Sequence, residues 1–83
     1  MSMRWWTPTI GETLSCKREL DNEYDDFAVA VWRDGRIVGR VPAEQARFFS
    51  DKIDKGRHVT TKVIGHRRNR GRGCELPCMY TIE

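Results

Sequence analysis

The chain has 83 residues, 33% of them charged and 39% hydrophobic, and a formal net charge of +3. A chain of this length forms one domain with a small core, so we expect residues 1–83 to be a single unit that functions through its surface. No apolar run approaches the ~20 residues that span a bilayer, and residues 1–6 lack the apolar core of a signal peptide. The sequence therefore indicates an intracellular protein with no membrane partner.

The first part of the chain predicts strands and an acidic loop. Residues 1–12 predict an opening strand followed by a turn. Residues 13–18 alternate in polarity with Leu14 and Cys16 on one face, which is typical of a half-buried strand. Residues 20–26 are polar, acidic and contain turn-forming residues, so they predict a loop.

The middle of the chain contains the clearest local signal, a β-hairpin. Residues 27–32 are rich in β-forming residues, and residues 36–41 return as the partner strand. Asp34 and Gly35 are the pair favoured in tight hairpins, because glycine adopts a positive φ at no steric cost. Trp32 is expected in the core or at the rim of the fold.

A helix and further strands follow the hairpin. Pro42 ends the second strand and suits the first turn of a helix, and Gly56 is expected to cap its C-terminus. The apolar stripe of this amphipathic helix consists of Ala46, Phe49 and Ile53. Residues 58–65 predict a strand, with one face formed by Val59, Thr61 and Val63. Residues 67–73 predict a flexible basic loop. Residues 74–82 predict a last strand whose inward face is formed by Cys74, Leu76, Cys78, Tyr80 and Ile82.

About six short strands, with one amphipathic helix after the central hairpin, predict a mainly β fold. Closing a small curved sheet is an economical way to bury the apolar faces of short strands. We therefore expect a small β-barrel of the OB-like or SH3-like type.

The sequence contains no pattern typical of catalysis or of a bound cofactor. It lacks a glycine-rich phosphate loop, a metal-ligand cluster and a nucleophile with a recognisable base. We therefore expect no enzymatic activity, no metal, no cofactor and no small-molecule substrate. The odd number of cysteines argues against a disulfide framework and favours small buried residues at Cys16, Cys74 and Cys78.

The charges are unevenly distributed along the chain. Six basic residues and no acids occur from Arg57 to Arg72, which favours an anionic partner, whereas residues 19–26 contain five acids and no base. The basic segment includes an arginine run formed by Arg67, Arg68, Arg70 and Arg72. This run is open to three interpretations: a solvated face, a contact with a phosphate backbone, or a nuclear-import signal that would place a eukaryotic protein in the nucleus.

Four segments together resemble one family. They are Gly-Glu-Thr-Leu at residues 11–14, Arg-Glu-Leu-Asp-Asn-Glu-Tyr-Asp at 18–25, Ala-Val-Ala-Val at 28–31 and Val-Gly-Arg-Val-Pro at 38–42. With the Asp-Gly turn between the last two, they resemble the HIRAN domain, which occurs in DNA-repair ATPases, over nearly the whole chain. The resemblance implies an OB-like barrel that binds single-stranded DNA with a free 3′-hydroxyl.

The resemblance also implies roles for three residues of the acidic segment. Asp25 would accept a hydrogen bond from the 3′-hydroxyl, Tyr24 would stack on a terminal base, and Asn22 would help to hold the end. The carboxylate of Asp25 would repel a 3′-phosphate. The residues alone leave a second interpretation open, in which Tyr24 and Asp25 shape a turn and cover one end of the barrel.

Further contacts with the DNA are implied outside this segment. Arg4, Trp5 and Trp6 resemble a phosphate-facing arginine followed by an aromatic residue that stacks on a base. Adjacent residues of an extended chain point to opposite faces, so one tryptophan is expected in the core and the other outside. Arg40 would face a phosphate, as would part of the arginine run. Ala43 departs from the family pattern, which has a basic residue at this position.

These observations support a non-catalytic module that recognises the 3′-hydroxyl end of single-stranded DNA, alone or within a larger host protein. The alternative is a protein–protein interaction module on the same barrel that has lost DNA binding. Glu23, Asp26 and Ala43 favour this alternative, with an exposed apolar patch around Trp5 or Phe48. A third interpretation is general polyanion binding through the arginine run.

Overall fold

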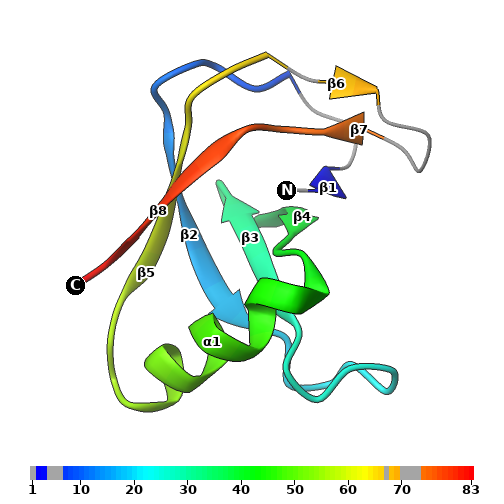
Figure 1. Ribbon diagram of the computed structural model, residues 1–83, viewed down its shortest axis with the longest axis vertical. Helices are drawn as coiled ribbons and strands as arrows, with labels where there is room; N and C mark the ends of the chain where they lie inside the picture. The colour runs from blue at the N-terminus through cyan, green and yellow to red at the C-terminus, as the bar shows by residue number, and fades with distance from the viewer. Residues whose placement is uncertain (1, 4–6, 67, 70–73) are drawn as a thin grey trace.

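The computed structural model describes residues 2–3, 7–66, 68–69 and 74–83. In these ranges eight strands form one antiparallel sheet in the order β6-β7-β1-β4-β3-β2-β5-β8, and a single helix packs against it (Figure 1). The strands are β1 (Ser2–Met3), β2 (Thr13–Arg18), β3 (Val29–Arg33), β4 (Arg36–Arg40), β5 (Val59–Val63), β6 (Arg68–Asn69), β7 (Cys74–Glu75) and β8 (Cys78–Ile82). The helix is α1 (Ala43–Asp54). The mainly β prediction with one helix after the hairpin is confirmed.

Strands β2 and β5 bury every second side chain, and this buried face continues onto β3. Cys16 on β2 lies opposite Val31 on β3 and opposite Val59 on β5, and all three side chains are buried. Leu14, two residues along β2, is buried on the same face, as the sequence predicts. This face forms the core, because a period of two places every second side chain of each strand on the same side.

The hairpin between β3 and β4 has the predicted two-residue turn. Arg33 pairs with Arg36, and the turn residues Asp34 and Gly35 have φ angles of 50° and 79°. Two consecutive positive φ angles are the geometry of the turn that matches the twist of a β-hairpin. The hairpin prediction is therefore confirmed.

The first strand of the hairpin begins two residues later than predicted. Val29 is its first residue, whereas the sequence predicts a start at Phe27. The backbone N–H of Phe27 donates to a carboxylate oxygen of Asp25 at 2.9 Å, and that of Ala28 donates to the Asp25 carbonyl at 3.3 Å. These bonds use the N–H groups of both residues within a turn, so neither N–H donates to the strand ladder.

The helix packs its predicted apolar stripe against β2, β3 and β5. Ala46 and Phe49 are buried, and the ring centroid of Phe49 lies 4.6 Å from that of Tyr80 on β8. Pro42 occupies the N-cap, and Gly56 follows the last turn with a φ of 83°. Both helix boundaries were predicted from these two residues. Proline has a fixed φ that suits the start of a helix, and glycine readily adopts the positive φ that follows its end.

The predicted last strand over residues 74–82 is wrong, because the structure divides it into β7 and β8. Between them Leu76 is buried, and Pro77 has no N–H to donate to a ladder. The carbonyl of Pro77 instead accepts the N–H of Ile64 at 3.0 Å. The predicted loop over residues 67–73 is also corrected in part, since Arg68–Asn69 form β6 and pair with β7.

The predicted closed barrel of about six strands is not confirmed. The sheet has β6 at one end of its order and β8 at the other, and no ladder joins these two ends within the described ranges. The sheet is nevertheless strongly curved. Strands β7 and β8 are far apart in the order although two residues, Leu76 and Pro77, connect them, and Figure 1 shows the chain running from one directly into the other.

Candidate nucleic-acid interface

The connection between β2 and β3, residues 19–28, is called the acidic loop below. Its ends meet, because the N–H of Glu19 donates to the carbonyl of Ala28 at 2.9 Å. The loop extends from the body of the sheet beside α1, where it is drawn in cyan in Figure 1. It contains three of the residues that the family resemblance assigns to the DNA end, so its internal contacts decide how these side chains are presented.

Asn22 organises the first half of the acidic loop. Its side-chain oxygen Oδ1 accepts the backbone N–H of Tyr24 at 2.8 Å and that of Asp25 at 3.1 Å. A short amide side chain often stabilises a turn by bonding to the backbone two or three residues further on. The described geometry therefore gives Asn22 a direct role in shaping the loop, and its Oδ1 is committed to the backbone.

Asp25 organises the second half. One carboxylate oxygen, Oδ1, accepts the N–H of Phe27 at 2.9 Å, and the side chain is half-buried. Within the described part of the chain, no hydrogen bond reaches its second oxygen, Oδ2. A carboxylate oxygen accepts hydrogen bonds, so Oδ2 is chemically suited to a hydroxyl donor. Asp25 thus combines a structural bond with an acceptor that a ligand can use.

Tyr24 extends into solvent from the loop that these bonds define. Its relative exposure is 96%, and that of Leu20 in the same loop is 82%. The interpretation that Tyr24 covers one end of the fold is wrong, because a side chain this exposed packs against little else. Large aromatic rings on a surface are suited to stacking on bases, since every base has an apolar face.

Arg40 is joined to the start of the acidic loop. Its Nε and Nη2 donate to the two carboxylate oxygens of Glu19, each at 2.8 Å. This hydrogen bond raises the pKa of Arg40 above its ordinary value, against a smaller opposing effect of burial. A two-bond pair fixes the plane of the guanidinium. Arg40 is therefore oriented beside the loop, with part of its charge compensated by Glu19.

A depression of about 330 Å³ adjoins the loop on the outer face of the sheet. Its lining consists of Arg18, Glu19, Leu20, Asp21, Ala30, Trp32 and Ile37. The Lys17 ammonium lies 5.3 Å from the centroid of the Trp32 ring. Lys17 and Trp32 were not predicted as surface site residues. The alternation of β3 could have indicated this, because Val29 and Val31 are buried on the core face and Trp32 lies on the opposite one.

The other residues predicted to contact DNA lie on or next to strands β1 and β6, and most of them are outside the described ranges. Strand β1 places Ser2 opposite Arg40 and Met3 opposite Gly39. Arg4, Trp5 and Trp6, which follow β1 in the chain, lie outside the described residues. The structure therefore brings the chain just before this predicted motif beside Arg40.

One member of the arginine run is placed by the sheet register. The backbone of Arg68 pairs with Glu75, Glu75 pairs with Ser2, and Ser2 pairs with Arg40. Three strand spacings put the backbones of Arg68 and Arg40 about 14 Å apart along the sheet. Its other members lie outside the described residues, namely Arg67, Arg70 and Arg72.

Two cysteines are described as free thiols, Cys16 buried in the core and Cys78 partly buried against it. Cys16 is a free buried thiol, and burial, aided by the nearby Cys78, raises its pKa to about 12. A thiol with such a pKa is a poor nucleophile near neutral pH, because the thiolate is the reactive form. Within the described ranges, no group of three or more His, Cys, Asp or Glu side chains could hold a metal ion.

The exposed Tyr24 ring and the oriented Arg40 guanidinium are groups of the kind that nucleic-acid-binding modules use for base stacking and phosphate contact. The comparison with protein families agrees. The HIRAN domain model matches residues 5–83, so the chain belongs to the HIRAN domain family. HIRAN domains are nucleic-acid-binding modules and act by binding rather than by catalysis. The searches of curated proteins and of solved structures gave no match. No described helix is long and apolar enough to cross a membrane.

Proposed function

We propose that this HIRAN domain recognises the free 3′-hydroxyl end of single-stranded DNA. The observation that carries the proposal is the conformation of the acidic loop. Two side-chain oxygens, from Asn22 and Asp25, hold the backbone so that the Tyr24 ring is 96% exposed. A ring held in this way is available for a terminal base without first leaving a packed site.

Asp25 supplies the preference for a hydroxyl end. Its Oδ2 would accept the 3′-hydroxyl proton, while Oδ1 keeps its bond to the N–H of Phe27. A 3′-phosphate in the same place would meet the carboxylate of Asp25 and the neighbouring acids Glu23 and Asp26. Like charges at short distance repel strongly where water is displaced, so the same loop would exclude a phosphorylated end.

The DNA backbone would contact cations on the sheet side of the loop. Arg40 is held beside the loop by Glu19 and would reach the phosphate nearest the end. The backbone of Arg68 on β6 lies three β-strands away from that of Arg40 on β4. This separation suits contact with a phosphate further along the DNA. For single-stranded DNA, each phosphate contact makes the slope of log binding constant against log salt concentration more negative by about 0.7, so salt should weaken binding. The remaining proposed contacts are Arg4, Trp5, Trp6, Arg67, Arg70 and Arg72.

The test is binding of three labelled single-stranded DNA oligonucleotides of one sequence, measured by fluorescence anisotropy at moderate salt. One has a free 3′-hydroxyl, one a 3′-phosphate, and one has its 3′ end closed in a hairpin. The proposal predicts tight binding of the first alone. Equal binding of all three, removed by salt, would mean that the arginine run binds polyanions without reading ends. A ribonucleotide version of the first oligonucleotide tests the preference for DNA.

A second candidate function is protein binding by the same loop. Leu20, at 82% exposure, and Tyr24 are exposed apolar groups between the acids Asp21, Glu23 and Asp26. This combination suits a partner segment that carries both basic and apolar residues. Absence of binding to all three oligonucleotides would favour it, and a pull-down with wild type and Tyr24→Ala would then test whether the loop captures a partner.

A further inference from the structure

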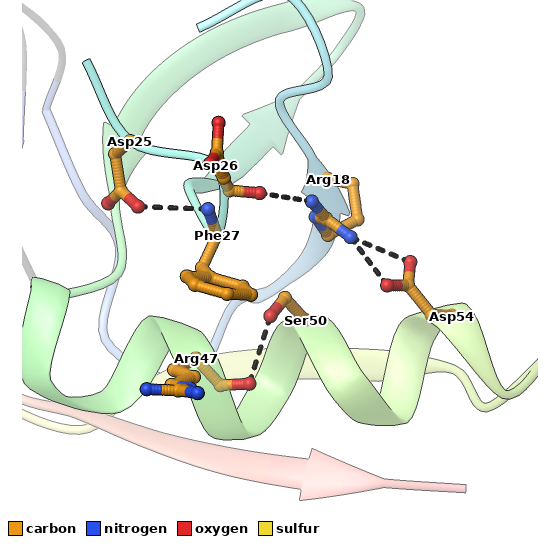
Figure 2. Close-up of polar contacts among 7 residues, drawn as sticks. All are labelled: Arg18, Asp25, Asp26, Phe27, Arg47, Ser50 and Asp54. Atoms are coloured by element: carbon orange, nitrogen blue, oxygen red, sulfur yellow. Dashed lines mark hydrogen bonds and ion pairs between the residues drawn. The ribbon is translucent and has the colours of Figure 1, made fainter. Parts of the chain in front are cut away.

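Arg18, the last residue of β2, connects the acidic loop to the helix. Its Nη1 donates to both carboxylate oxygens of Asp54 on α1, at 2.8 and 2.6 Å. Its Nη2 donates to the backbone carbonyl of Asp26 in the loop. Figure 2 shows the guanidinium between the two, and its side chain is only 15% exposed. One planar group therefore spans a strand end, a loop and a helix.

A second contact between loop and helix lies next to the first. The ring of Phe27 faces α1, and the guanidinium carbon of Arg47 lies 5.0 Å from its centroid (Figure 2). On the same side of α1, Ser50 is buried and its hydroxyl donates to the carbonyl of Arg47 at 2.9 Å. The loop is therefore linked to this side of the helix at two consecutive residues, Asp26 through Arg18 and Phe27 through Arg47.

We propose that Arg18 and Asp54 are positioning residues for the proposed end-reading site. The inference rests on the function proposed above. Holding the carbonyl of Asp26 fixes the peptide group between Asp26 and Phe27, whose N–H is the donor to Asp25 Oδ1. Arg18 thus holds the peptide group whose N–H binds the Asp25 side chain, and in this way it helps to orient Asp25. Asp54 holds the Arg18 guanidinium in the plane that reaches the loop.

The alternative is that Arg18 and Asp54 form an ordinary ion pair that affects stability alone. Asp54 is 58% exposed, and exposed pairs contribute little to stability. A positioning role makes a different prediction, because it concerns the population of one loop conformation. If a variant loop adopts the binding conformation about a tenth of the time, the apparent Kd rises about tenfold. Global unfolding need not change.

The experiment compares Asp54→Asn and Arg18→Lys with wild type. Asparagine keeps the size of the side chain and removes its charge. Lysine keeps the charge, but its single ammonium group does not reproduce the fork of donors. Asp51→Asn is the matched control, because Asp51 on the same helix makes an exposed pair at 3.0 Å with Lys55, which follows the last residue of α1. Two quantities are measured on the full chain: amide hydrogen exchange of Tyr24 and Phe27 without DNA, and the Kd values for oligonucleotides with 3′-hydroxyl and 3′-phosphate ends.

The expected result is faster exchange of both loop amides and a Kd for the 3′-hydroxyl oligonucleotide raised about tenfold in both variants. The ratio of the Kd for the 3′-phosphate oligonucleotide to the Kd for the 3′-hydroxyl oligonucleotide should fall, and the Asp51→Asn control should match wild type. Unchanged exchange with an unchanged Kd ratio would overturn the inference, even if the unfolding midpoint drops. If wild type itself does not distinguish the two ends, the proposed function fails, and the exchange rates still decide whether Arg18 and Asp54 order the loop.

Discussion

The core face of the sheet and the acidic loop are ordered by different forces. The core face is held by burial of aliphatic side chains on neighbouring strands, as in the row of Cys16, Val31 and Val59. The acidic loop is held by hydrogen bonds that its own backbone N–H groups donate to the side-chain oxygens of Asn22 and Asp25. Tyr24 and Leu20 face solvent from this loop, with 96% and 82% of their surface exposed.

The difference separates stability from function. Burial of apolar surface contributes most of the folding free energy, so the core face sets the stability of the chain. A loop with exposed side chains contributes little burial, and changes at its surface should leave folding intact. The chain can therefore present an aromatic ring to a ligand without weakening its core. The predictions below test this separation, from the largest expected effect to the smallest.

Leu76→Ala should cause the largest loss of stability. Leu76 is 1% exposed at the point where the chain passes from β7 to β8. Truncating a fully buried leucine costs about 2–5 kcal/mol, because transfer free energy is lost and a cavity remains. The measurement is urea unfolding followed by circular dichroism. Met79→Ala is the control, since Met79 is 57% exposed, and it should change the free energy of unfolding by less than about 0.5 kcal/mol. Equal losses in both variants would contradict the core assignment.

Tyr24→Ala should weaken DNA binding and leave the free energy of unfolding unchanged, in contrast to Leu76→Ala. Loss of one base-stacking contact costs about 1–3 kcal/mol of binding free energy, or roughly a fivefold to 150-fold rise in Kd. The measurement is anisotropy with the 3′-hydroxyl oligonucleotide, together with urea unfolding. Tyr24→Phe keeps the ring and should retain most of the affinity. Wild-type affinity in Tyr24→Ala would remove Tyr24 from the site.

The same contrast explains which parts of the structure could be predicted from the sequence. The core strands were predictable because burial imposes a period of two, which is readable at Leu14 and Cys16 without knowledge of their partners. The division of the last strand was not predicted, because it depends on pairing between Glu75 on β7 and Ser2 on β1 at the other end of the chain. Local alternation carries no information about such a distant partner.

The candidate site was predicted in part for a similar reason. The positions of Asn22, Tyr24 and Asp25 followed from the family resemblance. The ion pairs that hold the loop did not follow from the sequence. Arg18 pairs with a residue 36 positions away, and Arg40 with one 21 positions away. Long charged side chains have many possible partners, and the fold alone brings the chosen pair together.

The buried thiol of Cys16 should make the folded chain less stable at alkaline pH. Burial raises the pKa of its thiol from the ordinary 9.0 to about 12, so between these values the unfolded chain loses a proton that the folded chain keeps. Stability is therefore complete below pH 9.0 and falls as the pH rises, by at most ~1.4 kcal/mol per pH unit. The burial-raised pKa of Tyr80 acts in the same direction at higher pH. Urea unfolding near neutral pH and at about pH 10 measures the fall, in a reducing buffer. Cys16→Ala should reduce it, and an equal fall in that variant would contradict this origin.

Asn22→Ala should have a small effect on stability and should also reduce binding, because the Asn22 side chain holds the backbone of the acidic loop. Removing its Oδ1 leaves the N–H groups of Tyr24 and Asp25 without their acceptor, and in a loop that water can reach this costs about 0.5–1.5 kcal/mol. Asn22→Asp is the matched control, since it keeps an acceptor oxygen at the same position. The measurements are urea unfolding and the Kd ratio for 3′-hydroxyl and 3′-phosphate oligonucleotides. The Kd for the 3′-phosphate oligonucleotide divided by that for the 3′-hydroxyl oligonucleotide should fall in Asn22→Ala and be retained in Asn22→Asp. A reduced ratio in both variants would instead place the Asn22 amide group in direct contact with the DNA end.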